Sequence, residues 1–266
     1  MMKIDVEGAK LFIEEKGQGA AVILLHGFPL DHGMWEAQAN ALSTSFRVVT
    51  PDLRGMGQSA VPAQAIAIER YADDVLAIMD SLGIEKAALG GFSMGGYVAF
   101  ALMRKAPTRF TGLILANTRP EADSPEARKN RMNMAASLYE KGPAAARDAM
   151  LPKLLTPATL EAQPALVDRL RAMMDAMPAE GLVHAALAMA FRPDSAASLG
   201  EIRVPTLVIA GEHDAIAPPD VMRKMADAIP GARFEVVAGA SHLAPMEAPE
   251  AFNALLLDFL RNVVAG

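Results

Sequence analysis

The sequence predicts an α/β fold in which a mostly parallel, twisted sheet carries helices on both faces. Three observations support this prediction. Short apolar runs recur along the 266-residue chain, amphipathic segments of helical periodicity lie between them, and the strand pattern stops over residues 119–200 and then resumes. Short continuous apolar runs are typical of strands buried on both faces, and their alternation with helices implies parallel pairing.

The expected elements follow in a simple order along the chain. Residues 3–6 and 11–15 flank the turn signal Glu7-Gly8 and predict an antiparallel hairpin at one edge of the sheet. The buried strands are expected at residues 22–25, 47–50, 87–90, 112–116, 206–210 and 234–237. The helices between them are expected at residues 71–82, 95–104, 219–229 and 249–262.

Residues 119–200 differ in composition from the rest of the chain. They are rich in Ala, Met and Arg and are interrupted by many prolines, which predicts several short helices. The sheet pattern then resumes at residue 202. We therefore expect residues 1–118 and 201–266 to form the core, and residues 119–200 to form a short helical cap inserted between two strands.

Composition excludes several classes of function. The formal charge of −6, from 25 basic and 31 acidic residues, disfavours binding to nucleic acid, which requires cations opposite phosphates. The absence of cysteine excludes disulfides, thiolate zinc sites and a cysteine nucleophile. Acidic residues and a glycine interrupt the N-terminus, and no run approaches the ~20 apolar residues of a membrane span. We therefore expect a cytoplasmic protein with no membrane partner.

The segment Gly91-Phe92-Ser93-Met94-Gly95 carries the strongest chemical signal. It lies between the strand expected at 87–90 and the helix expected at 95–104. A G-x-S-x-G sequence in that setting predicts a nucleophile elbow, in which the serine occupies a sharp strand-to-helix turn. Gly91 and Gly95 leave room where side chains would collide. The sequence thus predicts Ser93 as a nucleophile.

A serine nucleophile needs a base and an acid that orients the base. His242 follows the last strand and Asp214 follows the strand at 206–210, so both belong at the sheet edge where Ser93 lies. Glu212 is the alternative acid. The other histidines are weaker candidates: we expect His213 to bond locally, His184 to be structural or to line the substrate site, and His32 to be an exposed loop residue.

The segment His26-Gly27-Phe28-Pro29 follows the strand at 22–25, the position that supplies a second oxyanion donor. The predicted oxyanion hole consists of the backbone N–H groups of Phe28 and Met94. Pro29 has no N–H, so the Phe28 amide is the free donor in this turn. We expect His26 and Gly27 to support the site, with His26 holding the loop through hydrogen bonds.

Together with Asp52-Leu53-Arg54-Gly55-Met56-Gly57-Gln58-Ser59, these motifs resemble those of the α/β-hydrolase superfamily over essentially the whole chain. The sequence is most similar to small bacterial carboxylesterases and enol-lactonases with a short helical cap. This resemblance implies the α/β-hydrolase fold, a Ser93-Asp214-His242 triad and no metal or organic cofactor. Asp52 and Arg54 are expected to fix loops. Dehalogenases and epoxide hydrolases have an aspartate in the elbow and dienelactone hydrolases a cysteine, so Ser93 argues against all three.

The sequence therefore predicts a serine esterase that cleaves carboxylic esters of small, mainly apolar substrates through an acyl-enzyme on Ser93. Acidic and basic residues balance over 119–200, which favours a neutral substrate, although a single inward arginine would reverse this. Methionines in that segment would make an adaptable aliphatic pocket. The alternatives are an enol-lactone type lactonase, a C–C bond hydrolase, a perhydrolase, and a small-molecule receptor on the same fold. The sequence makes no prediction of the oligomeric state.

Overall fold

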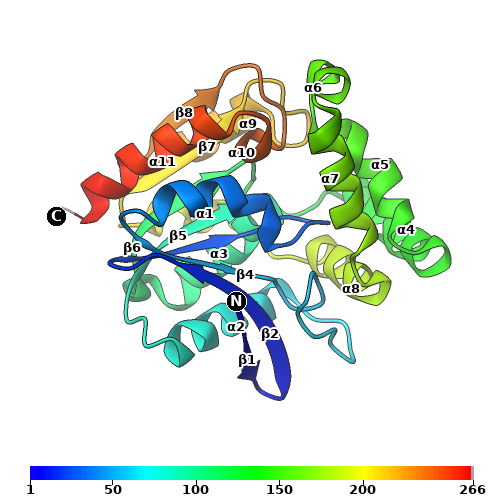
Figure 1. Ribbon diagram of the computed structural model, residues 1–266, viewed down its shortest axis with the longest axis horizontal. Helices are drawn as coiled ribbons and strands as arrows, with labels where there is room; N and C mark the ends of the chain where they lie inside the picture. Colours follow the sequence, from blue (N-terminus) through cyan, green and yellow to red (C-terminus); the bar gives the residue numbers. More distant parts are fainter. Residues whose placement is uncertain (265–266) are drawn as a thin grey trace.

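The computed structural model describes residues 1–264 and confirms the mostly parallel α/β sheet (Figure 1). Eight strands form one sheet in the order β1-β2-β4-β3-β5-β6-β7-β8. The β1–β2 hairpin pairs antiparallel at one edge and joins β4 antiparallel, and all other neighbours are parallel. The strands are β1 Met2–Val6, β2 Ala9–Lys16, β3 Ala21–Leu25, β4 Arg47–Pro51, β5 Ala87–Phe92, β6 Phe110–Ala116, β7 Thr206–Gly211 and β8 Arg233–Val237.

Helices cover both faces of this sheet, as the sequence predicts. Figure 1 shows α1 and α11 together on one side, and α2 and α3 on the other. Helix α9 contacts β7 and β8, and the short α10 precedes α11. These helices are α1 Glu36–Leu42, α2 Ile68–Ser81, α3 Met94–Lys105, α9 Pro219–Asp227, α10 Ala244–Glu247 and α11 Pro249–Val264.

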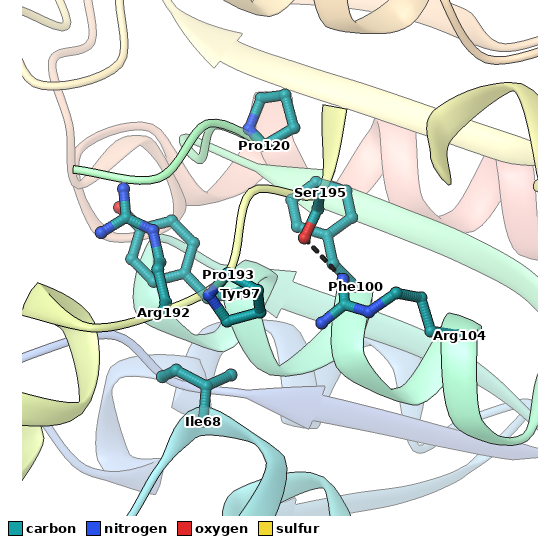
Figure 2. A pocket seen from close by; sticks show the side chains of 8 residues that line it. All are labelled: Ile68, Tyr97, Phe100, Arg104, Pro120, Arg192, Pro193 and Ser195. Atoms are coloured by element: carbon teal, nitrogen blue, oxygen red, sulfur yellow. Dashed lines mark hydrogen bonds between the residues drawn. The ribbon is translucent and has the colours of Figure 1, made fainter. Parts of the chain in front are cut away.

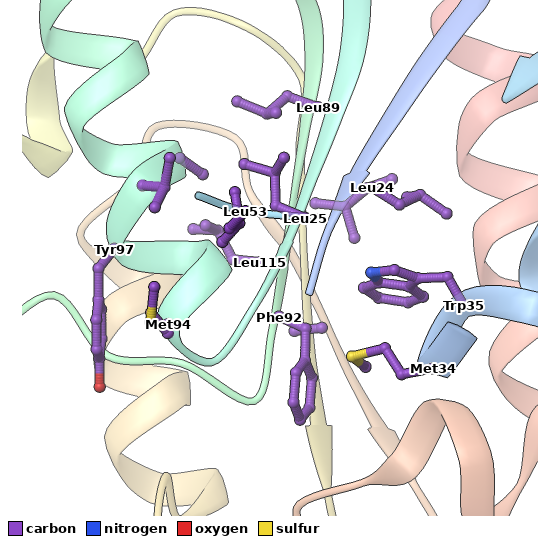
Figure 3. Close-up of a cluster of buried hydrophobic side chains, with 14 of the residues drawn as sticks. Leu24, Leu25, Met34, Trp35, Leu53, Leu89, Phe92, Met94, Tyr97 and Leu115 are labelled. Carbon is purple, nitrogen blue, oxygen red and sulfur yellow. The ribbon is translucent and has the colours of Figure 1, made fainter. Parts of the chain in front are cut away.

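The centre of the core lies on both sides of the middle strands. Figure 3 shows Met94 and Tyr97 of α3 on one side of these strands, and Met34 and Trp35 on the other. Trp35 meets the Phe92 ring edge-on, with ring centroids 6.3 Å apart. Burying a large apolar side chain contributes about 1.5–3 kcal/mol, so this packing fixes β5 and the turn that follows it.

Between β6 and β7 the chain forms helices and no strand. Figure 1 shows these helices (green to yellow) gathered beside the sheet. Helix α4 packs against α8 and α5, and α5 also packs against α7. The segment contacts the sheet region closely at Gly181, where an added Cβ would lie 1.6 Å from the Gly55 carbonyl oxygen. The helices are α4 Pro125–Lys141, α5 Ala144–Leu154, α6 Pro157–Ala162, α7 Pro164–Asp175, α8 Ala179–Ala190 and the 3₁₀ helix η3 Ala196–Glu201.

Differences from the sequence predictions are confined to short elements and element ends. The sequence did not predict helix α1. Its sequence, EAQANAL, has only one short apolar face, so the helical periodicity is too brief to be recognised. Helix α2 begins three residues before its expected start, and β5 continues through Phe92 to the residue before Ser93. Within residues 1–264, none of the helices combines the length and the apolar character that a membrane span requires.

Candidate active site

Ser93 occupies the turn that joins β5 to α3, and its backbone is strained. Its φ of 51° and ψ of −113° are unusual for a residue with a side chain. Three hydrogen bonds hold this conformation. The Ser93 amide donates to the Ala116 carbonyl at 2.9 Å, while the Ser93 carbonyl accepts from the Gly96 amide at 2.9 Å and from the Thr118 hydroxyl at 2.8 Å. The turn leaves the Ser93 side chain partly exposed among buried neighbours.

The glycines around Ser93 allow backbone segments to approach closely. A Cβ on Gly91 would lie 2.4 Å from the Gly95 carbonyl oxygen, and a Cβ on Gly95 would lie 2.3 Å from the Leu25 carbonyl oxygen. A Cβ on Gly27 would meet the Phe92 ring at 2.7 Å. The turn at Ser93 and the loop after β3 therefore pack together, which places Phe28 beside the elbow.

His242 and Asp214 lie in line with Ser93, although they come from loops after different strands. His242 Nε2 is 3.0 Å from Ser93 Oγ, and His242 Nδ1 is 2.8 Å from Asp214 Oδ2. Both side chains are buried. An ionised carboxylate only accepts hydrogen bonds, so Nδ1 carries the proton and Nε2 is free to accept the Ser93 hydroxyl.

The surroundings of Asp214 favour its ionised form. Burial by itself raises the pKa of this carboxyl, but the charge and hydrogen bond of His242, the Ala217 amide and the Asn117 side chain together lower it. The second carboxylate oxygen accepts hydrogen bonds from the amides of Ile216 and Ala217 at 2.8 and 3.0 Å. Asp214 is thus held as an anion against the histidine.

Sequence reasoning missed two residues that support this arrangement. Buried Asn117, directly after β6, donates to Asp214 Oδ2 at 2.9 Å. Glu247 in α10 is also buried and accepts hydrogen bonds from the Ser241 and Thr156 amides. The available signals were a polar residue ending a buried strand for Asn117, and an acid five residues beyond His242 for Glu247.

Two backbone amides near Ser93 are free to donate. Met94 begins α3, so its N–H lacks an intrahelical partner, and neither it nor the Phe28 N–H donates to a protein acceptor within residues 1–264. His26 contacts both the loop after β3 and the turn after β4. Its Nδ1 lies 2.9 Å from the Gly27 carbonyl oxygen and its Nε2 accepts from the Leu53 amide at 2.9 Å, while burial lowers the His26 pKa.

The remaining histidines and Glu212 lie outside this line of residues. Exposed Glu212 accepts from the Gly239 amide, and its carboxylate is 3.8 Å from the exposed His213 ring. His184 is buried, and its Nδ1 has no hydrogen-bond partner in the described part of the chain. These positions do not bring Glu212 or His213 to Ser93.

The expectation that His32 is exposed was wrong. The centroid of the His32 ring lies 4.8 Å from that of the Phe12 ring, and His32 Nδ1 lies 2.7 Å from Asp52 Oδ1. Burial lowers the pKa of His32, but its hydrogen bond and charge interaction with Asp52 outweigh burial and raise it. Donor atoms of Asp31, His32 and Asp52 lie within 4.8 Å of one another, and this is the one group of metal-ligating type found within residues 1–264.

Asp52 and Arg54 hold loops, as expected. Asp52 accepts hydrogen bonds from the His32 and Gln58 amides at 2.8 and 2.7 Å. The Arg54 guanidinium forms two hydrogen bonds with Asp74 of α2, at 2.7 and 2.6 Å. These interactions anchor the turn after β4 to the loop after β3 and to α2.

A cavity of about 260 Å³ lies beside this site and is lined in part by α4 and α5, while Ser93, Asp214 and His242 are not among its lining residues. Three of its lining residues neighbour the candidate catalytic residues: Phe28, Tyr97, one helical turn after Ser93, and Ile216, which bonds Asp214. The other lining residues are Arg119, Asp123, Ala127, Asn130, Arg131, Met134, Met150 and Lys153. The lining is therefore part apolar and part cationic.

Tyr97 also contacts Arg192, whose guanidinium carbon lies 4.1 Å from the centre of the Tyr97 ring (Figure 2). Arg192 and Tyr97 line a depression with Arg104 and Ser195, which hydrogen-bond at 2.6 Å. This depression has no room for a water molecule, so it is a packing contact that joins α3 to the end of α8.

Comparison with known proteins agrees with this geometry. Residues 20–249 match the family model described as the alpha/beta hydrolase fold. An esterase from Thermogutta terrifontis, solved with malate bound, is 44% identical, with a TM-score of 0.95 over 98% of this chain and 97% of its own. The enol-lactonase from Burkholderia xenovorans LB400 is 34% identical, with a TM-score of 0.91 over 97% of this chain and 99% of its own.

A curated relative points the same way. The 3-oxoadipate enol-lactonase 1 of Acinetobacter baylyi is 30% identical over 97% of this chain and 95% of its own length. The elbow, the mostly parallel sheet and these similarities lead to one conclusion: the chain belongs to the α/β-hydrolase family of enzymes, which its sequence motifs resemble.

Proposed function

We propose that this protein is a serine hydrolase that cleaves small carboxylic esters through an acyl-enzyme on Ser93. The observation that carries the proposal is the chain of contacts from Ser93 Oγ to His242 Nε2 at 3.0 Å and from His242 Nδ1 to Asp214 at 2.8 Å. Within this arrangement a neutral imidazole accepts the serine proton while the carboxylate stabilises the resulting cation.

The first half-reaction forms the acyl-enzyme. Ser93 Oγ attacks the ester carbonyl as His242 takes its proton, and the Phe28 and Met94 amides stabilise the oxyanion. His242 then donates that proton to the departing alkoxide as the bond from the carbonyl carbon to the alcohol oxygen breaks. Loss of one such donor typically costs about 10²–10³ in rate.

Water completes the reaction. It enters beside the acyl group, gives a proton to His242 and attacks the carbonyl carbon through the same oxyanion hole. Collapse of the second tetrahedral intermediate breaks the bond to Ser93 Oγ, which recovers its proton from His242 and releases the acid. Every proton transfer uses His242, and these steps require no cofactor.

The division of the chain into a core of residues 1–118 and 201–266 and a helical cap of residues 119–200 is part of this proposal. Residues of α4 and α5 line the cavity beside Ser93, which supports a role for this segment in substrate binding. Met134 and Met150 supply an adaptable apolar wall. The cationic side chains that line the same cavity differ from the mainly apolar pocket expected from the balanced charge of this segment.

Lactone hydrolysis is the second candidate function. It uses the same triad, because a lactone is a cyclic ester whose alcohol stays attached to the acyl group. The relatives from Burkholderia xenovorans and Acinetobacter baylyi described above are named enol-lactonases, and the structure of the Thermogutta terrifontis esterase contains malate, a dicarboxylate. The cations that line the cavity of this chain would attract a substrate that carries a negatively charged carboxylate.

A direct test compares wild type with Ser93→Ala on p-nitrophenyl acetate and butyrate. We expect wild type to release p-nitrophenol and the alanine variant to lose turnover without losing its fold, measured by circular dichroism. Unchanged turnover in the variant would exclude Ser93 as nucleophile. Tight binding of a small molecule without turnover of any ester or lactone would instead support a receptor.

A further inference from the structure

We propose that the cavity beside Ser93 contains an anion subsite, formed by Arg119 and Lys153, that binds a carboxylate of the substrate. This inference rests on the proposed ester hydrolase function and specifies its substrate class. The substrate is a small ester or lactone that carries a carboxylate on a short apolar spacer.

The charges that line the cavity are mostly positive. Three cations, Arg119, Arg131 and Lys153, face a single acid, Asp123. Asp123 is already neutralised, because Arg192 contacts it at 2.6 Å and Arg131 at 3.2 Å. Buried Arg192 is itself fixed by its contact with Tyr97 (Figure 2). The cavity therefore keeps a net positive charge in a chain whose formal charge is −6.

Arg119 and Lys153 are the cavity cations whose side chains form no hydrogen bond within the described part of the chain, whereas Arg131 bonds Asp123. Arg119 Nε is buried and lacks a hydrogen-bond partner in the described part of the chain, and its ion pair with the half-exposed Glu121 carboxylate is long, at 3.9 Å. Lys153 makes no ion pair or side-chain hydrogen bond with any residue between 1 and 264. A buried donor without a partner is costly, and a ligand carboxylate would satisfy it.

The position of Arg119 links this subsite to the catalytic residues. Arg119 follows Asn117 and Thr118 at the end of β6, and these two residues bond Asp214 and the Ser93 carbonyl. Backbone geometry therefore fixes where the Arg119 side chain begins relative to the elbow. The apolar Met134 and Met150 line the same cavity, so a carboxylate held by the cations leaves a short aliphatic stretch against the methionines.

The test compares two esters that differ in the charge at one end. Monomethyl glutarate and methyl 5-methylhexanoate have the same spacer, and an isopropyl group in the second replaces the carboxylate of the first. We expect wild type to have a higher kcat/KM for the anionic ester. Arg119→Gln should reduce this preference about tenfold. Lys153→Gln should reduce it about threefold, because Lys153 is exposed and solvent weakens its charge interaction. Both reductions should arise chiefly in KM.

Arg171→Gln is the matched control, because Arg171 is an exposed arginine of α7 that does not line the cavity. It should leave the preference unchanged. An equal preference in wild type, Arg119→Gln and Lys153→Gln would overturn the subsite while leaving ester hydrolysis intact. Lys153 is exposed, so its variant is expected to fold even if the Arg119 variant does not.

A binding measurement keeps the two proposals separable. Calorimetry with free glutarate and the Ser93→Ala protein should detect binding that Arg119→Gln weakens and Arg171→Gln does not. If wild type cleaves neither these esters nor the p-nitrophenyl esters, the proposed function fails and this titration alone decides the subsite. Absence of glutarate binding, or binding that is insensitive to Arg119, would refute the subsite.

Discussion

The Glu247 carboxylate accepts a hydrogen bond from the Ser241 amide at 2.6 Å, next to His242. Its other oxygen accepts from the Thr156 amide at 2.7 Å, and the Leu243 amide donates to the Leu154 carbonyl at 2.9 Å. One buried carboxylate therefore joins the loop that carries His242 to the junction of α5 and α6. These bonds tie the loop that carries the imidazole to the helical segment between β6 and β7.

Glu247→Ala should lower kcat by about tenfold or more, because it frees the histidine loop and leaves two buried amides without an acceptor. Glu247→Gln retains one acceptor oxygen and should recover part of the activity. The measurement is kcat and KM for a neutral p-nitrophenyl ester, with thermal unfolding to follow stability. A loss of stability with unchanged kcat would show that Glu247 does not position His242.

The order of strands and the residues at their ends could be predicted because each buried strand is a continuous apolar run bounded by turn residues. Ser93, Asp214 and His242 each follow such a run, so topology alone places them at one sheet edge. The partners of these residues could not be predicted in the same way. Glu247 reaches Thr156 across 91 positions, a pairing that depends on how the helical segment packs.

The positive charge of the cavity lining could not be predicted from the sequence either. Basic and acidic residues balance over residues 119–200, but packing distributes them unevenly. The cavity is lined by Arg119, Arg131 and Lys153 and by a single acid, Asp123, which pairs with Arg131 and Arg192. His32 shows the same limit. The loop that carries His32 has no regular apolar periodicity that would reveal burial, and its partner Asp52 lies 20 positions away.

Asp214→Asn should lower kcat about 10⁴-fold, because an amide in place of the carboxylate favours the wrong tautomer of His242 and removes the charge opposite its cation. Glu212→Gln should stay within about twofold of wild type, since exposed Glu212 bonds the Gly239 amide away from His242. The comparison requires only kcat values for one ester. Similar losses in the two variants would support Glu212 as an alternative acid.

Gly95→Ala should destabilise the fold by about 3 kcal/mol or more, because the added Cβ would lie 2.3 Å from the rigid Leu25 carbonyl oxygen. Gly200→Ala is the control, because an ideal Cβ there meets no atom within 4 Å. Its stability should stay within about 0.5 kcal/mol of wild type. Chemical denaturation gives both values, and equal midpoints for the two variants would contradict the close packing at the elbow.

The His32–Asp52 pair should make stability depend on pH. Asp52 raises the pKa of His32 in the folded protein above its ordinary value of 6.5, so protonated His32 stabilises the fold below that pH. This contribution is lost as pH rises through the folded pKa. The difference in unfolding free energy between wild type and His32→Asn should therefore shrink from pH 6 to pH 8.5. A difference that is constant or grows with pH would contradict this pairing.

The central claim is that Ser93, activated by His242, forms a covalent intermediate, and active-site labelling tests it most directly. Wild type is incubated with a p-nitrophenyl alkylphosphonate, and the product is analysed by intact mass and peptide mapping. We expect one phosphonyl group per chain, located on Ser93, with slow labelling in His242→Ala and none in Ser93→Ala. Labelling at another residue, or equal labelling of the Ser93→Ala protein, would contradict the proposed mechanism.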